Sequence, residues 1–131
     1  QLQVIRRMAR DMHHPTAIVG APTVREADGL AMSSRNRNLT MDQRARAPEL
    51  QRALAELVTT AEDDGGKGSI SAALNAARRR IEASGARIDY LSVVDADDLV
   101  EVLEIRRPAR VAVAAWVGET RLIDNLPILS S

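Results

Sequence analysis

With 131 residues, the chain has room for one ordinary domain, or for one small domain plus the end of another. Apolar residues make up 45% of it but aromatic residues only 2%, and cysteine is absent, so the core must be aliphatic and disulfides and thiolate metal sites are excluded. A formal net charge of zero with so few aromatic residues argues against nucleic-acid binding, and the longest apolar run, Val111 to Val117, is too short to cross a bilayer. These features fit a protein of the reducing cytoplasm that binds neither nucleic acid nor membrane.

The first segment is typical of the end of an α/β unit. Apolar residues recur at helical spacing across Gln1–Met12, and Pro15 ends that helix. The apolar run Thr16–Pro22 is typical of a buried parallel strand. Because no partner strands for it are evident, we expect residues 1–23 to be the tail of a Rossmann-like nucleotide-binding domain that is otherwise missing from this chain.

The middle of the chain predicts a loop followed by helices. Val24–Leu39 shows no clean period and is predicted to be a long loop. Thr40 and Gln43 form a capping box that opens a helix, which Pro48 interrupts or restarts. Two helical apolar stripes follow, separated by a polar glycine-rich connector at Glu62–Ser69. The stripes consist of Leu50, Leu54, Leu57, Val58 and Ala61, and of Ile70, Ala73, Leu74, Ala77 and Ile81, the second ending near Gly85.

The last third changes from a helical period to an alternating one. Arg87–Asp95 and Arg110–Gly118 are predicted strands, and Thr120–Ile128 is the returning arm of a hairpin. Residues 97–104 are ambiguous between a turn and a short strand or helix. We therefore expect residues 24–131 to form an α+β domain, a small and mostly antiparallel sheet packed with two to three helices.

Within the predicted loop, the string MSSRN gathers two hydroxyls, a guanidinium, an amide and free backbone N–H groups. Arginine recognises phosphate through paired hydrogen bonds, so the string is a plausible phosphate cradle. Residues 1–60 contain nine arginines and six carboxylates, a mild positive bias that favours an anionic small molecule. The local sequence leaves a second interpretation open, a solvated loop that leads to a capped helix.

Two longer strings bear on this choice: IVGAPTVREADGLAMSSRNRNLT, and AAWVGETRLIDN near the carboxyl end. Together they resemble the pantothenate synthetase family, and the resemblance runs from Gln1 to about Ile128. It implies ATP-dependent joining of pantoate to β-alanine through a pantoyl adenylate, with magnesium accompanying the ATP. It also implies that this chain is the carboxy-terminal lid of such an enzyme, following the end of its Rossmann-like domain.

The resemblance assigns ATP-binding residues in the loop, which matches that family's version of the mobile KMSKS loop. It implies that Ser33, Ser34 and Arg35 are ligands of the ATP phosphates and that Met32 is a further loop contact. It also implies that the backbone of Val24 meets the adenine ring, so that its side chain is replaceable.

Outside the loop, the family's binding and catalytic positions are matched only in part. Gln1 matches a glutamine that hydrogen-bonds pantoate, but the lysine preceding that glutamine is absent, and Lys67 in the connector cannot replace it. The HxGH-type histidines also have no match, since His13 and His14 are adjacent and are better explained as helix-end residues. We therefore expect no catalytic residue in this chain, and no activity of the chain alone.

The remaining polar clusters have structural interpretations. The run Arg78–Arg80 is more typical of a solvated helix face than of a binding site. Asp95, Asp97 and Asp98 are expected in turns and caps rather than around a metal ion. Three polar residues of the second string are expected to pair within the hairpin: Arg121, Asp124 and Asn125.

Two other classes of function compete with this one. The apolar face of Gln1–Pro22 favours a structural, self-associating module, and for the same reason we expect a homo-oligomer. A lone nucleotide-binding or RNA-binding domain is disfavoured by the zero net charge and the two aromatic residues.

Overall fold

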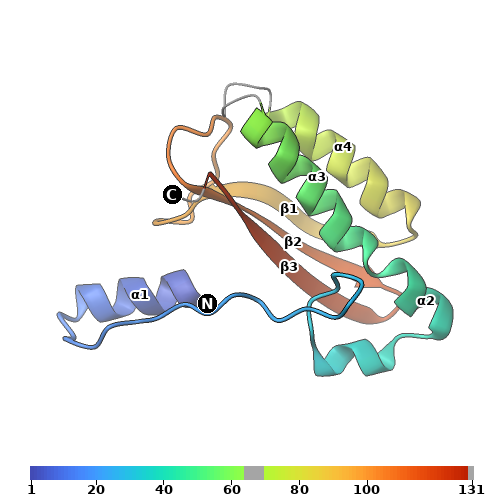
Figure 1. Cartoon of the computed structure of the whole chain (residues 1–131), viewed down its shortest axis with the longest axis horizontal. Coiled ribbons are helices and arrows are strands. Elements are labelled where there is room, and N and C mark those ends of the chain that lie inside the picture. The colour runs from blue at the N-terminus through green and yellow to red at the C-terminus, as the bar shows by residue number, and fades with distance from the viewer. Residues whose placement is uncertain (64–69, 130–131) are drawn as a thin grey trace.

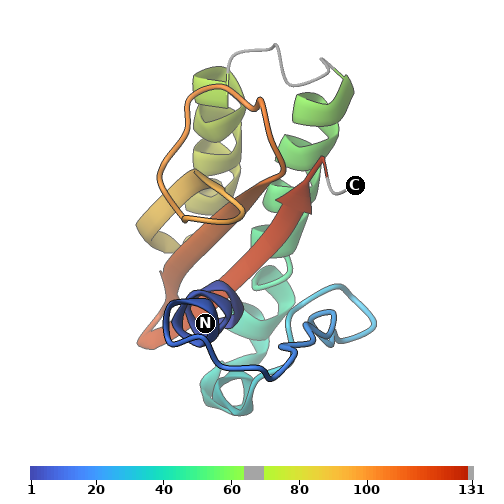
Figure 2. The same ribbon diagram turned by 90° about the vertical axis from the view of Figure 1, so that its left-hand side faces the viewer.

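The computed structural model describes residues 1–63 and 70–129, and it has α+β architecture. Helices α3 and α4 lie side by side across one face of a three-stranded antiparallel sheet of order β1-β2-β3, and α1 lies on the other side of that sheet (Figures 1 and 2). The elements are α1 (Leu2–Asp11), a 3₁₀ helix (Ser34–Asn38), α2 (Met41–Arg46), α3 (Glu49–Asp63), α4 (Ile70–Ala83), β1 (Arg87–Asp95), β2 (Ala109–Val117) and β3 (Thr120–Ile128). The expected small antiparallel sheet packed with two to three helices is confirmed.

The predicted start of the helical region is confirmed. The Thr40 hydroxyl accepts a hydrogen bond from the Gln43 amide at 3.3 Å, and the Gln43 side chain accepts one from the Thr40 amide at 3.0 Å. These two bonds satisfy amide groups that the first turn of a helix leaves without partners. Pro48 then lies between α2 and α3, as expected of a residue that cannot donate a backbone hydrogen bond within a helix.

Both apolar stripes are buried between the helices and the sheet. Leu54 and Ile81 are fully buried, and so are Val111 and Val113 on the facing side of β2. Because the core is built from aliphatic side chains, its stability depends on close packing of many small contacts. The connector at Glu62–Ser69 lies mostly outside the described residues.

The predicted hairpin is confirmed. Val117 pairs with Thr120 across a tight turn in which Gly118 has a φ of +59°, a value that favours glycine. β1 pairs with the other edge of β2, with one irregularity in register between Ile88 and Tyr90. The sheet therefore places the β2–β3 turn at one end and the β1–β2 connection at the other.

The predicted strand at Thr16–Pro22 is wrong. This segment has no strand pairing and its residues are mostly exposed. An apolar sequence forms a strand only when a neighbouring strand accepts its backbone hydrogen bonds, and among the described residues none lies beside it. The segment instead continues from α1 as an extended connection (Figure 1).

Helix α1 is amphipathic, but its apolar face is left largely exposed. An ion pair of 3.5 Å joins Arg10 to Asp97. The large apolar side chains exposed on and just after the helix are Val4, Ile5, Met8 and Met12. In the described parts of the chain, no helix combines the length and apolar character needed to span a membrane.

Candidate functional site

The segment Val24–Leu39, here named the arginine loop, is more ordered than the sequence predicts. The Met32 amide donates to the Val24 carbonyl at 3.0 Å, and the Glu26 amide donates to the Leu30 carbonyl at 2.8 Å. Gly29 turns the chain between them with a φ of +93°, a backbone conformation that favours glycine. These bonds close a miniature hairpin that brings Val24 beside Met32, two positions that the sequence separates by seven residues.

A 3₁₀ helix, Ser34–Asn38, follows this miniature hairpin, where the sequence predicts only irregular structure. The Ser33 hydroxyl caps it by accepting a hydrogen bond from the Arg35 amide at 3.2 Å. The Asn36 side-chain amide donates to the Ala31 carbonyl at 3.1 Å and ties the helix back to the miniature hairpin. This 3₁₀ helix is held by local hydrogen bonds of the Ser33 and Asn36 side chains. Such bonds leave no periodic pattern in the sequence, so the helix could not be predicted from it.

All five candidate ATP-binding residues are exposed on this loop. Val24 is 67% exposed and Met32 is 57% exposed, although both are apolar. Among the described residues, the side chains of Ser34 and Arg35 make no hydrogen bond or ion pair. An ordinary solvated loop would be equally exposed. Here, however, the unpaired Ser34 hydroxyl and Arg35 guanidinium belong to a backbone that hydrogen bonds already hold in place.

Arg35 borders a shallow groove of about 360 Å³ beside the β2–β3 turn. The groove is lined by Arg35, Asn38, Trp116, Glu119, Thr120 and Arg121. Arg121 is held by Asp89 on β1, at 2.7 Å, and so is part of a structural ion pair across the sheet. This contact confirms a structural role for Arg121, but its partner is on β1 and not within the hairpin.

An ion pair between a partly buried arginine and a buried aspartate, which sequence reasoning missed, anchors the loop to the sheet. Both terminal nitrogens of Arg25 donate to Asp124 on β3, at 2.7 and 2.9 Å. The side chain of Asp124 is only 4% exposed. Hydrogen bonding to this carboxylate raises the pKa of Arg25 above its ordinary value, more than burial lowers it.

Asp124 therefore pairs with the loop and not within the hairpin as expected, whereas Asn125 does pair there, its side-chain oxygen accepting from Arg110 at 2.5 Å. The available sequence signal for the missed pair was that one long string contains three arginines and the other contains an aspartate. Neither string indicates which arginine and which carboxylate meet.

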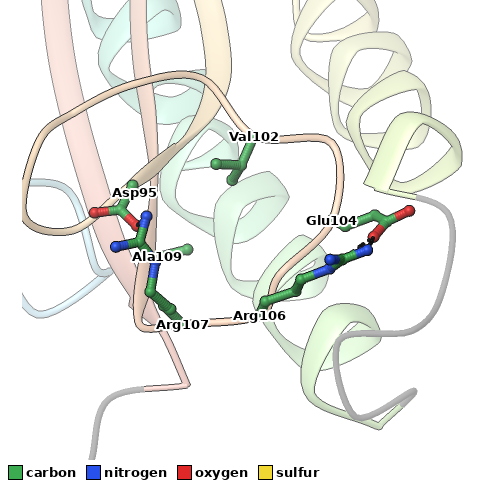
Figure 3. Close-up of a pocket in the computed structure, with 6 residues that line it drawn as sticks. All are labelled: Asp95, Val102, Glu104, Arg106, Arg107 and Ala109. Carbon is green, nitrogen blue, oxygen red and sulfur yellow. Dashed lines mark hydrogen bonds and ion pairs between the residues drawn. The ribbon is translucent and has the colours of Figure 1, made fainter.

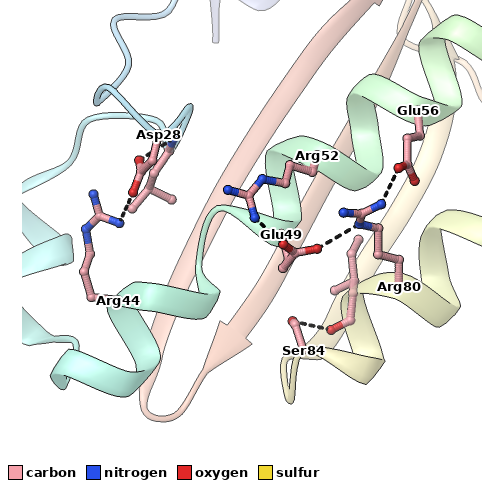
Figure 4. Close-up of polar contacts among 9 residues, drawn as sticks. Asp28, Arg44, Glu49, Arg52, Glu56, Arg80 and Ser84 are labelled. Carbon is pink, nitrogen blue, oxygen red and sulfur yellow. Dashed lines mark hydrogen bonds and ion pairs between the residues drawn. The ribbon is translucent and has the colours of Figure 1, made fainter.

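A second ion pair fastens the other side of the arginine loop. Arg44 on α2 donates to Asp28 at 2.6 Å (Figure 4). The hydrogen bond from Arg44 holds the pKa of the Asp28 carboxyl below its usual range. The same carboxyl accepts a bond from the Leu30 amide at 3.3 Å, and Leu30 is buried in the core. The loop is thus attached to α2, the core and β3.

Gln1 and the two histidines are not brought to this loop. Gln1 is exposed at the start of α1, where its carbonyl accepts the bond from the Ile5 amide. His13 and His14 follow the end of α1 and are exposed, in agreement with helix-end positions. No hydrogen bond or ion pair among the described residues joins any of the three to the arginine loop.

The carboxylate cluster lies at the opposite end of β2, and its expected turn role is confirmed. One Asp95 oxygen accepts bonds from the Asp97 and Asp98 amides at 2.8 and 3.3 Å. These bonds lower the pKa of Asp95, and Arg107 pairs with its other oxygen at 2.9 Å. Figure 3 shows this pair at the small cavity of about 160 Å³ there, together with the pair Arg106–Glu104.

The arginine run on α4 is also explained structurally. Arg80 donates to Glu49 at 2.8 Å and also contacts Glu56, and so bridges α4 to α3 (Figure 4). Arg78 and Arg79 are exposed, in agreement with a solvated face. No group of three or more His, Cys, Asp or Glu side chains in the described residues is placed to hold a metal ion.

The molecule is thus a small α+β domain that presents serine hydroxyls and an arginine on an anchored loop. Hydroxyl and guanidinium groups are the kinds of donor that proteins use to bind phosphate. The family described as pantoate-beta-alanine ligase matches residues 1–127. The chain belongs to the pantoate–β-alanine ligase family, and the resemblance stated from its sequence is confirmed.

Individual relatives agree with this assignment. Pantothenate synthetase from Thiobacillus denitrificans is 46% identical over 131 residues, which is all of this chain and 46% of that protein. The enzyme from Salinispora arenicola is 49% identical over 128 residues, 98% of this chain and 44% of that protein. The chain thus spans less than half the length of the curated relatives it matches.

Solved structures match the fold as well. Pantothenate synthetase from Thermus thermophilus superposes with a TM-score of 0.86 at 44% identity, covering 95% of this chain and 45% of that one. The ligase from Francisella tularensis, solved with beta-gamma ATP and beta-alanine, has a TM-score of 0.60 at 25% identity and covers 96% of this chain and 39% of that one.

Proposed function

We propose that this chain is the carboxy-terminal lid of an ATP-dependent ligase that joins pantoate to β-alanine, with residues 1–23 the tail of its nucleotide-binding domain. The observation that carries the proposal is the anchored arginine loop, with Ser34 and Arg35 free to meet a ligand. Membership of the ligase family supplies the reaction. A cytoplasmic location is part of the proposal.

In the proposed first step, the pantoate carboxylate attacks the α-phosphorus of ATP. The bond to the pyrophosphate oxygen breaks, and negative charge accumulates on the leaving pyrophosphate. Ser33, Ser34 and Arg35 donate hydrogen bonds to that growing charge, which lowers the barrier without covalent work by the protein. The products are pantoyl adenylate and pyrophosphate.

In the second step, the amine of β-alanine attacks the acyl carbon, the bond to AMP breaks, and the amine loses a proton. A closed lid would protect the adenylate from hydrolysis, since it excludes water from the site. Val24 and Met32 would contact the nucleotide, with the Val24 backbone against the adenine ring. Gln1 would hydrogen-bond pantoate from the other part of the site.

The donor set of the arginine loop fits phosphate oxygens and does not fit a metal ion. Hydroxyl and guanidinium groups dominate it, and the described residues contain no cluster of metal-binding side chains. Magnesium, which prefers carboxylate, water and substrate phosphate oxygens, would therefore enter with ATP and not through this domain.

ATP–pyrophosphate exchange tests this function. The full-length protein should catalyse exchange that depends on pantoate, and the 131-residue chain alone should catalyse none, because the HxGH-type histidines have no match within it. Pantoate-independent exchange, or none, by the full-length protein would reject the function. Exchange by the 131-residue chain would show that the catalytic groups lie within it.

The exposed apolar face of α1 favours a second candidate, a module that associates with its own copies through Val4, Ile5, Met8 and Met12. Light scattering on the 131-residue chain should then report a mass above that of one copy. A monomer with α1 folded would contradict self-association. The proposed homo-oligomer of the longer protein is measured separately, on the full-length ligase.

A further inference from the structure

We propose that Arg25 is a positioning residue for ATP: by joining the miniature hairpin to Asp124, it holds the backbone of Val24 and Met32 where the nucleotide binds. This inference rests on the proposed function, because it takes ATP as the ligand of the arginine loop. Arg25 itself points inward and is not proposed to touch ATP. Its side chain is 21% exposed, whereas its neighbour Val24 is 67% exposed.

The first argument is the number and direction of the contacts that Arg25 makes. Two parallel hydrogen bonds to Asp124 fix the plane of the guanidinium. The same group donates to the Gly29 carbonyl at the tip of the miniature hairpin, at 3.0 Å, and to the Asn125 carbonyl at 3.4 Å. One side chain therefore connects the turn of the loop to two successive residues of β3.

The second argument is the alternation of the loop residues. Arg25 pairs with Ala31 in the single bridge of the miniature hairpin, and the next pair outward is Val24 with Met32. Side chains alternate along such a pair, so fixing Arg25 on the sheet side presents its neighbours on the opposite side. Because the Met32 amide is hydrogen-bonded to the Val24 carbonyl, a rotation of the backbone at Arg25 would move Val24 and Met32 together.

The third argument is that lysine cannot replace this arrangement. An ammonium group can approach one carboxylate but lacks the planar fork that binds both oxygens while also reaching a carbonyl. The Asp124 carboxylate is buried, so a mispaired cation would leave it incompletely satisfied. The geometry thus requires arginine and not merely a positive charge.

The test uses the full-length ligase with Arg25→Met, Arg25→Lys, Asp124→Leu and the double variant Arg25→Met/Asp124→Leu. Each single methionine or leucine change leaves one charged partner alone and should lower Tm. The double change removes both charges and should recover much of that Tm, since paired apolar replacement of an ion pair is often well tolerated. Stability and positioning are thereby separated.

If Arg25 positions the loop, the double variant should still show a KM for ATP raised at least about tenfold, since misplaced binding groups cost about this much or more. Arg25→Lys should show a similar rise. The control Arg80→Met/Glu49→Leu removes an ion pair between α4 and α3 and should leave the KM for ATP unchanged. A double variant with the wild-type KM would overturn the proposal.

Amide hydrogen exchange supplies a readout that does not depend on activity. In the double variant, exchange at the Glu26 and Met32 amides should rise at least about tenfold while the β2 amides keep their protection, because only the loop has lost its anchor. Wild-type protection at Glu26 and Met32 would overturn the positioning role. If wild-type ligase shows no pantoate-dependent exchange of ATP and pyrophosphate, the proposed function fails, and loss of loop protection still tests the anchor separately.

Discussion

Two loops at opposite ends of β2 are both rich in arginine, yet they use it differently. In the connection at residues 96–108, Arg106 pairs with Glu104 and Arg107 pairs with Asp95 (Figure 3). In the arginine loop, Arg25 is consumed by the buried pair with Asp124, while Arg35 has no partner among the described residues. The arginine loop borders the groove beside the β2–β3 turn and the other loop borders the small cavity, but within the described residues only the arginine loop leaves an arginine unpaired there.

The comparison indicates what leaves an arginine side chain available on a loop. Each loop has one apolar side chain that is fully in the core, Leu30 in the arginine loop and Ile105 in the other, and both are 5% exposed or less. The two loops differ in which of their arginines pair with carboxylates. Glu104 in the second loop and Asp95 at the end of β1 pair with that loop's arginines. Around the arginine loop, Asp28 and Asp124 instead hold the loop to α2 and β3.

Arg35→Ala in the full-length ligase should produce the largest effect. If Arg35 donates to the leaving pyrophosphate as proposed, its removal should slow adenylation by roughly 10²–10³-fold. Tm should change little, because the Arg35 side chain is exposed and makes no hydrogen bond or ion pair in the described part of the chain. Single-turnover formation of the adenylate measures the rate, and differential scanning calorimetry measures Tm.

Arg106→Ala is the matched control, since Arg106 is exposed beside the small cavity and has a carboxylate partner. Its adenylation rate should equal that of the wild type. An equal loss in both variants would mean that general surface charge, and not the arginine loop, assists the reaction. An unchanged rate in Arg35→Ala would return that side chain to the solvated-loop interpretation.

Leu30→Ala and Ile105→Ala sharpen the comparison at the apolar anchors. Each removes a buried side chain and should lower the free energy of unfolding by about 2–4 kcal/mol. Only Leu30→Ala should also raise the KM for ATP, because only that anchor lies behind the candidate ATP-binding residues. Urea unfolding and steady-state kinetics on the same preparations check both statements, and equal KM values would contradict the second.

Asp95→Asn removes the carboxylate that pairs with Arg107, and the pH dependence of Tm should show its contribution to stability. The folded-state pKa of Asp95 is lowered, first by the Asp97 amide, so its ionised form stabilises the fold. That contribution is fully present above the unfolded pKa of about 3.9 and is lost as pH falls through the lower folded value. The variant should have a lower Tm at pH 7 and a shallower loss of Tm below about pH 4.

Thermal unfolding between pH 7 and pH 2.5 measures this difference. Asp97→Asn is the control, because its exposed carboxylate is more weakly involved, at 3.5 Å from Arg10. A profile for Asp95→Asn that runs parallel to the wild type would contradict the assignment of acid sensitivity to this carboxylate.

Local rules were sufficient to predict most of the fold from the sequence. The capping box at Thr40 and the hairpin turn at Gly118 depend on nearby residues, so their signals are contained in short strings. The strand predicted at Thr16–Pro22 failed because strand formation depends on a partner elsewhere. Its apolar composition was real, but composition does not supply hydrogen bonds.

The site was predictable only in part, for the same reason. The exposed positions Ser33 to Arg35 form one string, and the family resemblance marked them directly. The anchor joins Arg25 to Asp124 over ninety-nine positions, and no periodicity links residues so far apart. The 3₁₀ helix was also missed, because side-chain caps on short helices leave no repeating pattern.

Val24→Ala should give the smallest effect and tests whether the arginine loop binds ATP through backbone or side chains. Val24 is largely exposed, and its carbonyl is fixed by the Met32 amide whatever the side chain. Stability should change by less than about 0.5 kcal/mol, as for most surface substitutions. If the adenine ring meets the backbone, the KM for ATP should stay within about twofold of the wild type, a difference of less than about 0.5 kcal/mol. A larger rise would assign the contact to the isopropyl group, and the loop would then recognise the base through apolar packing as well as the phosphates through charge.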